Sequence, residues 1–173
     1  FEFGLNVYSV RKNIDLYNKW YFNHVHQFHG MVAAPQYSNY FEETVNITQK
    51  KAWGRRINYH TREIQRSTGI YVVPGGYARV EVPEEIVGKN VIIQVGTHPN
   101  NLAYASSAKH TRFAISVTKY EVNQKTTEVY TPLGGGIYIL VPYDSDFGNK
   151  TIKVEGSVVR GQMFRKSIKS NLI

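Results

Sequence analysis

The sequence predicts a mainly β protein: an antiparallel, jelly-roll-like β-sandwich with a short N-terminal helical segment. Three observations predict this fold class. The chain uses 13 tyrosines and 8 phenylalanines beside many valines and isoleucines, residues that suit half-buried pleated surfaces. From about Thr44 onward, short runs alternate apolar and polar residues. Turn residues rich in glycine, proline and asparagine separate these runs, as in a sandwich or a partly closed barrel.

The N-terminal residues 9–29 follow a different period. Their apolar residues are spaced by three and four, which is the repeat of one helix face. The members of this stripe are Ile14, Tyr17, Tyr21, Val25 and Phe28. Other large apolar residues lie off the stripe, so a pair of strands remains the alternative.

Six later runs carry strand patterns, and turns fill the gaps between them. The expected strands cover residues 44–49, 78–82, 91–97, 111–117, 136–141 and 151–155. The expected turns cover residues 74–76, 88–90, 98–101, 134–136 and 144–149. In the first run Val45 and Ile47 should face the core, and in the last run Ile152 and Val154 should do so.

The length of 173 residues and mass of 19.8 kDa are those of one domain with a sizeable core. We divide the chain into an N-terminal segment, 1–30, packed on the sandwich, the sandwich itself, 31–164, and a basic tail, 165–173.

Secretion is compatible with the sequence. Cysteine is absent, but a chain of this size needs no disulfide. Asn46 and Asn149 each begin a glycosylation sequon, although such triplets also arise by chance. No leader precedes Phe1 and no apolar stretch approaches the roughly 20 residues that span a bilayer. We expect a secreted or extracellular protein without a transmembrane segment, either a processed piece or a fragment, and leave its oligomeric state open.

The net charge of +8 and the pI near 9.6 favour anionic partners. Sulfated or sialylated glycans, acidic lipids and nucleic acids all fit, and simple solubility is the plain alternative.

No catalytic or metal-binding constellation stands out. His24, His26 and His29 cannot all converge on one ion from a regular helix or strand. Residues 144–155 begin like a calcium loop but lack its glycine at the sixth position. Residues 134–136 lack the Lys-Ser/Thr of a phosphate loop. We therefore expect no metal and no cofactor.

Two groups of loop residues combine cations, aromatic rings and amides, which can bind sugars by stacking and by hydrogen bonds to sulfate or carboxylate. The first patch consists of Trp53, Arg55, Arg56 and Tyr59. The second patch consists of His98, Asn100, Asn101, Tyr104 and Arg112. A solvated connecting loop is the alternative interpretation of the first patch.

An ordered set of short motifs spans residues 27–164. The motifs include Ser67–Gly75, Val95–His98 and Thr131–Ile139, followed by Lys153–Val158. This order resembles the β-domain that precedes the zinc domain in enhancin-like, mucin-degrading metallopeptidases and the related animal channel-associated factors. The resemblance implies a β-sandwich that abuts a zinc domain and helps present glycoprotein substrate. Such enzymes need a His-Glu-x-x-His helix, and no His-Glu pair occurs here.

Three hypotheses of function follow. The first is a secreted, non-catalytic, lectin-like module that binds glycans or glycoproteins, anionic ones among them, through the two patches. The second is a fragment or subunit of a mucin-degrading zinc metallopeptidase whose catalytic domain lies elsewhere. The third is a basic defence or cytotoxic protein that binds polyanions.

Overall fold

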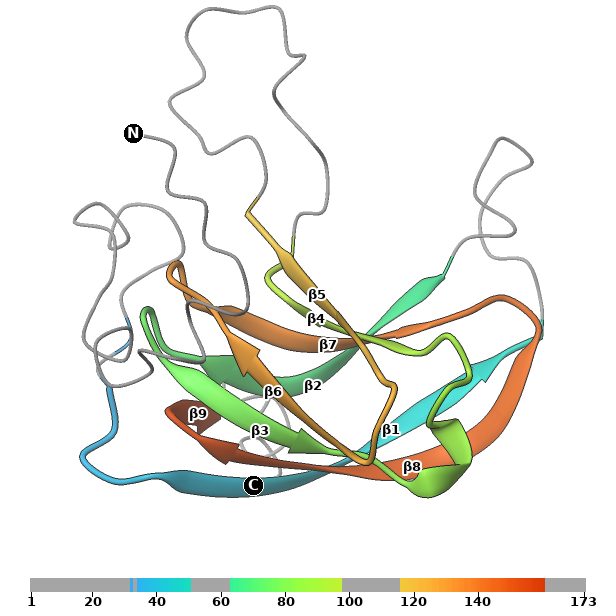
Figure 1. Cartoon of the computed structure of the whole chain (residues 1–173), viewed down its shortest axis with the longest axis horizontal. Helices are drawn as coiled ribbons and strands as arrows, with labels where there is room; N and C mark the ends of the chain where they lie inside the picture. Colours follow the sequence, from blue (N-terminus) through green and yellow to red (C-terminus); the bar gives the residue numbers. More distant parts are fainter. Residues whose placement is uncertain (1–31, 33, 51–62, 98–115, 161–173) are drawn as a thin grey trace, which may run out of the picture.

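A computed structural model describes residues 32, 34–50, 63–97 and 116–160, and Figure 1 shows two twisted sheets packed face to face. The mainly β, antiparallel sandwich expected from the sequence is confirmed. The helical segment expected within 9–29 lies outside the described residues, as does the basic tail.

Both sheets are antiparallel throughout. The four-stranded sheet has the order β1 (Asn39–Gln49), β8 (Ser145–Gly156), β3 (Tyr77–Glu81), β6 (Thr126–Tyr130). The five-stranded sheet has the order β5 (Thr118–Glu121), β4 (Ile92–Val95), β7 (Gly135–Val141), β2 (Ile64–Val72), β9 (Val158–Arg160). A 3-10 helix, η1 (Glu84–Ile86), links β3 to β4.

The core lies between the two sheets and is built mainly from β-branched side chains. On each strand every second residue points inward, because side chains alternate across a pleated strand. Val45 and Ile47 of β1 and Ile152 and Val154 of β8 are buried as expected, and the five-stranded sheet contributes a facing set. That set includes Ile70, Val72, Ile93, Val95, Ile137, Ile139, Val141 and Val158.

Five expected strands are confirmed, and they correspond to β1, β3, β4, β7 and β8. Two of them are longer than expected: β1 begins at Asn39 and not near residue 44, and β8 begins at Ser145 and not near residue 151. The expected turn over 144–149 is wrong beyond its first residue: Asp144 turns with a φ of 63°, and β8 begins at Ser145. Gly148 has a φ of 68° and lies at the register shift between β1 and β8. It therefore belongs to a β-bulge within β8 and not to a turn. The expected strand 111–117 falls largely outside the described residues.

The edges of the two sheets are tied together by side chains. At one edge the Tyr120 hydroxyl of β5 donates to the Tyr130 carbonyl of β6 at 2.7 Å and accepts from the Tyr130 amide at 2.9 Å. At the other edge Arg160 of β9 lies over the ring of Phe41 of β1, 5.2 Å from its centroid, and pairs with Glu43. These contacts hold the sandwich closed on both sides.

The sandwich has two ends, which we call the Tyr77 end and the Gln49 end. At the Tyr77 end, β1 and β3 begin, β6 and β8 finish, and β2 turns into β3 through Pro74 and Gly75. At the Gln49 end, β1 finishes, β2 and β8 begin, and the Ile64 amide donates to the Gln49 side chain at 3.0 Å.

Candidate functional site

The outer face of the four-stranded sheet is polar and is lined in rows by residues in register. The row nearest the Tyr77 end holds Tyr77 and Tyr130. The second row holds Tyr40, Glu155, Arg79 and Glu128. The third row holds Glu42, Lys153, Glu81 and Thr126. None of these side chains belongs to the core between the two sheets.

Three tyrosines, one cation and one carboxylate form what we call the aromatic corner: Tyr40, Tyr77, Arg79, Glu128 and Tyr130. The rings of Tyr77 and Tyr130 are stacked, with centroids 6.1 Å apart and planes 24° apart. The Tyr130 hydroxyl donates to Glu128 Oε2 at 2.7 Å, and Arg79 Nη2 lies 3.8 Å from Glu128 Oε1. Rigid aromatic faces bordered by fixed hydrogen-bonding groups suit a ligand with both apolar and hydroxyl surfaces.

Tyr40 extends the corner across the sheet and is 54% exposed. Its hydroxyl donates to Glu42, and this hydrogen bond is the main reason that the pKa of Tyr40 is raised to about 12. Like an ordinary tyrosine phenol, whose pKa is about 10, Tyr40 is protonated at neutral pH and is a neutral hydrogen-bonding group on the face.

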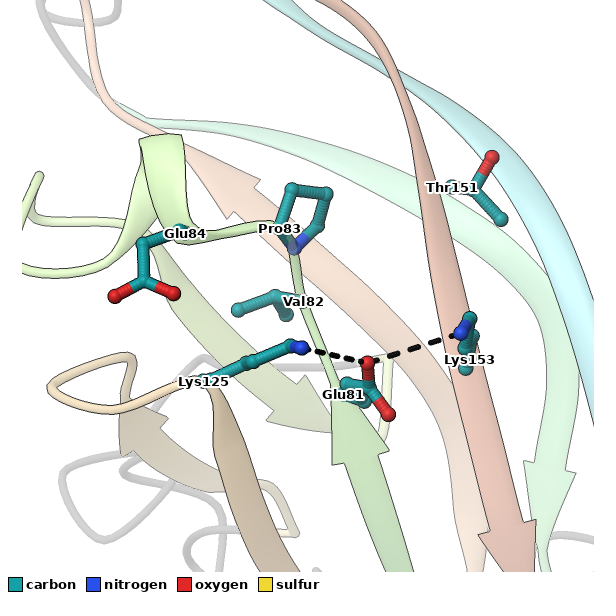
Figure 2. A pocket seen from close by; sticks show the side chains of 7 residues that line it. All are labelled: Glu81, Val82, Pro83, Glu84, Lys125, Thr151 and Lys153. Carbon is teal, nitrogen blue, oxygen red and sulfur yellow. Dashed lines mark ion pairs between the residues drawn. The ribbon is translucent and has the colours of Figure 1, made fainter.

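A shallow pocket of about 330 Å³ opens on the same sheet face where β3 ends before the other strands do. Pro83 has no amide hydrogen and leads the chain from β3 into η1, which leaves the side of β8 open. Figure 2 shows Glu81 between two lysines, with Oε1 at 3.4 Å from Lys125 Nζ and 3.7 Å from Lys153 Nζ. The lining combines the apolar side chains of Val82 and Pro83 with charged groups of both signs, so the pocket has no excess of positive charge to attract an anion.

The charge of the chain is unevenly distributed. The described residues contain nine Lys and Arg against eleven Asp and Glu, a net charge of −2. Because the whole chain carries +8, the remaining residues together carry +10. The sandwich itself therefore has no excess of positive charge.

Both loop patches expected from the sequence lie outside the described residues, but the strands that flank them are described. Residues 51–62 connect β1 to β2 and leave from the Gln49 end. Residues 98–115 connect β4 to β5 and leave from the Tyr77 end, where Thr118 Oγ1 donates to the Tyr130 carbonyl at 3.4 Å. The two patches are thus anchored at opposite ends, and the second is anchored beside the aromatic corner.

The two sequon asparagines are described. Asn46 on β1 and Asn149 on β8 are both exposed on the outer face and are partners in register. They lie toward the Gln49 end, away from the aromatic corner.

Metal-ligand geometry is not found within the described ranges: no three His, Asp or Glu side chains gather there. Asp146, from the loop considered for calcium, pairs instead with Lys50 at 2.5 Å. This hydrogen bond lowers the pKa of Asp146. No helix among the described residues has the length and apolar character needed to cross a bilayer.

The sequence did not reveal the aromatic corner. Tyr40, Tyr77 and Tyr130 come from three different strands, and only the pairing of β1, β8, β3 and β6 brings them to one face. In each of these strands an outward tyrosine is separated by one residue from a charged residue. This repeated spacing is the local feature of the sequence that could have indicated the aromatic corner.

The fold defines the class of protein, a two-sheet antiparallel β-sandwich domain. The family follows from comparison with known proteins: the chain belongs to the N-terminal domains of M60-like peptidases, whose family model matches residues 43–155. The enhancin-like resemblance seen in the sequence is thereby confirmed.

Curated relatives include a TRPM8 channel-associated factor homolog of Danio rerio, 30% identical over 92 residues, and TRPM8 channel-associated factor 1 of Homo sapiens, 31% identical over 101 residues. These matches cover 53% and 58% of this chain but only 10% and 11% of the relatives. The chain thus corresponds to about a tenth of each.

Similar solved structures include the IMPa metallopeptidase of Pseudomonas aeruginosa, with a TM-score of 0.49 and 14% identity over 72% of this chain and 13% of that one. A conserved Bacillus anthracis protein of unknown function has a TM-score of 0.44 and 16% identity over 69% of this chain and 22% of its own.

Proposed function

We propose that this chain is a secreted, non-catalytic accessory module that binds glycans of glycoproteins and works beside an M60-like catalytic domain. Membership of the family of N-terminal domains supports the accessory role. The absence of a His-Glu pair from all 173 residues supports the non-catalytic part, because zinc peptidases of this type use that pair for metal binding and general base catalysis.

The observation that carries the proposal is the aromatic corner on the outer face of the four-stranded sheet. Tyr77 and Tyr130 present a stacked aromatic surface, and Arg79 and Glu128 provide a donor and an acceptor beside it. A sugar ring needs this combination, because its C–H faces pack on aromatic rings while its hydroxyls need hydrogen-bond partners.

The second loop patch joins this site in our proposal. The strands β4 and β5 that flank residues 98–115 meet this segment at the Tyr77 end, and the segment contains His98, Asn100, Asn101, Tyr104 and Arg112. The first patch, Trp53 with its neighbours, is anchored at the other end, so we give it the lesser role.

The proposal is tested by binding an O-glycosylated mucin glycopeptide to the full chain by titration calorimetry. Tyr130→Ala and Tyr77→Ala should each weaken binding about tenfold or more, since loss of a stacking ring costs about 1.4 kcal/mol or more. Tyr143→Ala is the matched control, because Tyr143 is also an exposed tyrosine, 41% exposed, but lies in the turn between β7 and β8 at the Gln49 end. Trp53→Ala tests the first patch. Unchanged binding by both corner variants would remove the aromatic corner as the site.

A longer metallopeptidase that contains this chain as one part is a second candidate, favoured by the small share of each relative that the chain matches. A transcript whose reading frame continues into a His-Glu-x-x-His segment would establish it. A stop codon directly after Ile173 would end it.

A further inference from the structure

The two sequons of the chain meet on the outer face of the four-stranded sheet. Asn46 and Asn149 lie roughly a hundred residues apart in sequence, yet β1 and β8 place them directly opposite each other. Directly opposite residues have Cβ atoms about 4.5–5.5 Å apart. The threonine of each sequon, Thr48 or Thr151, lies two residues further along its strand and so points to the same face as its asparagine.

The amide nitrogens of both asparagines are unused within the described part of the chain. Asn46 accepts a hydrogen bond through Oδ1 from the Thr48 amide at 3.0 Å, which leaves its Nδ2 free. Other asparagines of the sandwich differ: Asn39 Nδ2 donates to the Val158 carbonyl at 2.9 Å, and Asn123 Nδ2 donates to Glu121 at 3.1 Å. A sugar on either sequon nitrogen would therefore break no hydrogen bond of the described fold.

We propose that Asn46 and Asn149 form a paired N-glycosylation site. In each reaction Nδ2 loses one proton and forms a bond to C1 of an oligosaccharide, and the bond from C1 to a lipid pyrophosphate breaks. The lipid pyrophosphate is the leaving group and takes up the proton. The sugar donor is therefore an oligosaccharide linked to a lipid through pyrophosphate. The inference rests on the secretory route included in the proposed function.

The paired glycans would cover one half of the outer sheet face and leave the other half without a glycan. They rise from the half near the Gln49 end, where residues 51–62 leave the sandwich. Thr151 belongs to one sequon and also lines the shallow pocket, so a glycan on Asn149 stands about 7 Å from the pocket along β8. The aromatic corner lies at the other end of the sheet, away from both asparagines. Partners would then approach from the Tyr77 end.

The test is secretion of the full chain, behind a signal leader, from mammalian cells, with intact-mass measurement before and after peptide-N-glycosidase. The wild type should carry two glycans, and enzyme treatment should leave an aspartate at each site. Asn46→Gln and Asn149→Gln should each retain one glycan, and the double variant none. Asn123→Gln is the control and should retain two, because Asn123 begins no sequon. Thr151→Val should remove the glycan of Asn149 while keeping that asparagine.

A secreted wild type with no glycan, or with a glycan at one site only, would overturn the paired site. The glycopeptide titration is scored separately on the same samples. Two glycans without glycopeptide binding would contradict the proposed binding function but support the paired modification site. Glycopeptide binding by a chain without glycans would support the binding function but contradict the paired site.

Discussion

At the scale of single residues, the packing of β8 against its neighbours leaves no space for a side chain at Gly156. Its φ is 137°, which side-chain-bearing residues rarely adopt, and a Cβ there would lie 2.5 Å from the Tyr77 carbonyl oxygen. Gly156 is in register with both Asn39 of β1 and Ala78 of β3, so neither neighbour can move away without breaking a ladder.

We therefore expect Gly156→Ala to lower the free energy of unfolding by about 3 kcal/mol or more, through clash and backbone strain together. Gly69→Ala is the control. Gly69 also has a positive φ, 72°, but a Cβ there would meet nothing within 4 Å. Strain alone should cost about 1–2 kcal/mol. Urea unfolding curves measure both values, and equal losses would contradict the packing argument.

At the scale of elements, Tyr120 links the edge strand β5 to β6 of the other sheet. Its hydroxyl both donates to and accepts from the backbone of Tyr130. We expect Tyr120→Phe to lower stability by about 1–3 kcal/mol, because it removes two hydrogen bonds while keeping the ring. Tyr143→Phe, at an exposed turn, should change stability little. Denaturant titration compares the two.

The same tyrosine makes stability depend on alkaline pH. Burial raises the pKa of the Tyr120 phenol above its ordinary value, so the folded state holds this proton more tightly than the unfolded state. Its contribution is complete below the ordinary tyrosine pKa of about 10 and is lost as the pH rises through the raised value. Tyr120→Phe should therefore show a weaker loss of stability above pH ~10 than the wild type. Identical slopes would contradict this role.

At the scale of the whole molecule, the excess positive charge lies outside the described strands of the sandwich. The described residues carry −2 and the others +10. Arg55→Gln with Arg56→Gln should thus lower the salt concentration at which the chain leaves a heparin column, since it removes two cations from the part of the chain that carries the excess positive charge. Lys119→Gln with Lys125→Gln removes the same charge from sandwich lysines that pair with Glu63 and Glu81, and should change elution less. Equal shifts would show that net charge alone governs binding.

The sequence predicted the fold class and the strands whose inward residues are valine or isoleucine, such as β1 and β7. It missed β6, whose inward Thr127 weakens the apolar alternation, and β2, which Gly69 interrupts. It also missed the aromatic corner, because Tyr77 and Tyr130 become neighbours only through long-range pairing. Strand patterns are local, whereas register between distant strands depends on how the whole sandwich packs.

In the proposed function, glycoprotein glycans bind the outer face of the four-stranded sheet at its Tyr77 end. Backbone-amide chemical-shift mapping during titration with an O-glycosylated mucin glycopeptide tests it most directly. We predict saturable shifts at Tyr40, Tyr77, Arg79, Glu128 and Tyr130, with little change at Asp146 near the Gln49 end. Shifts confined to residues 51–62, or none on this face at saturating glycopeptide, would contradict it.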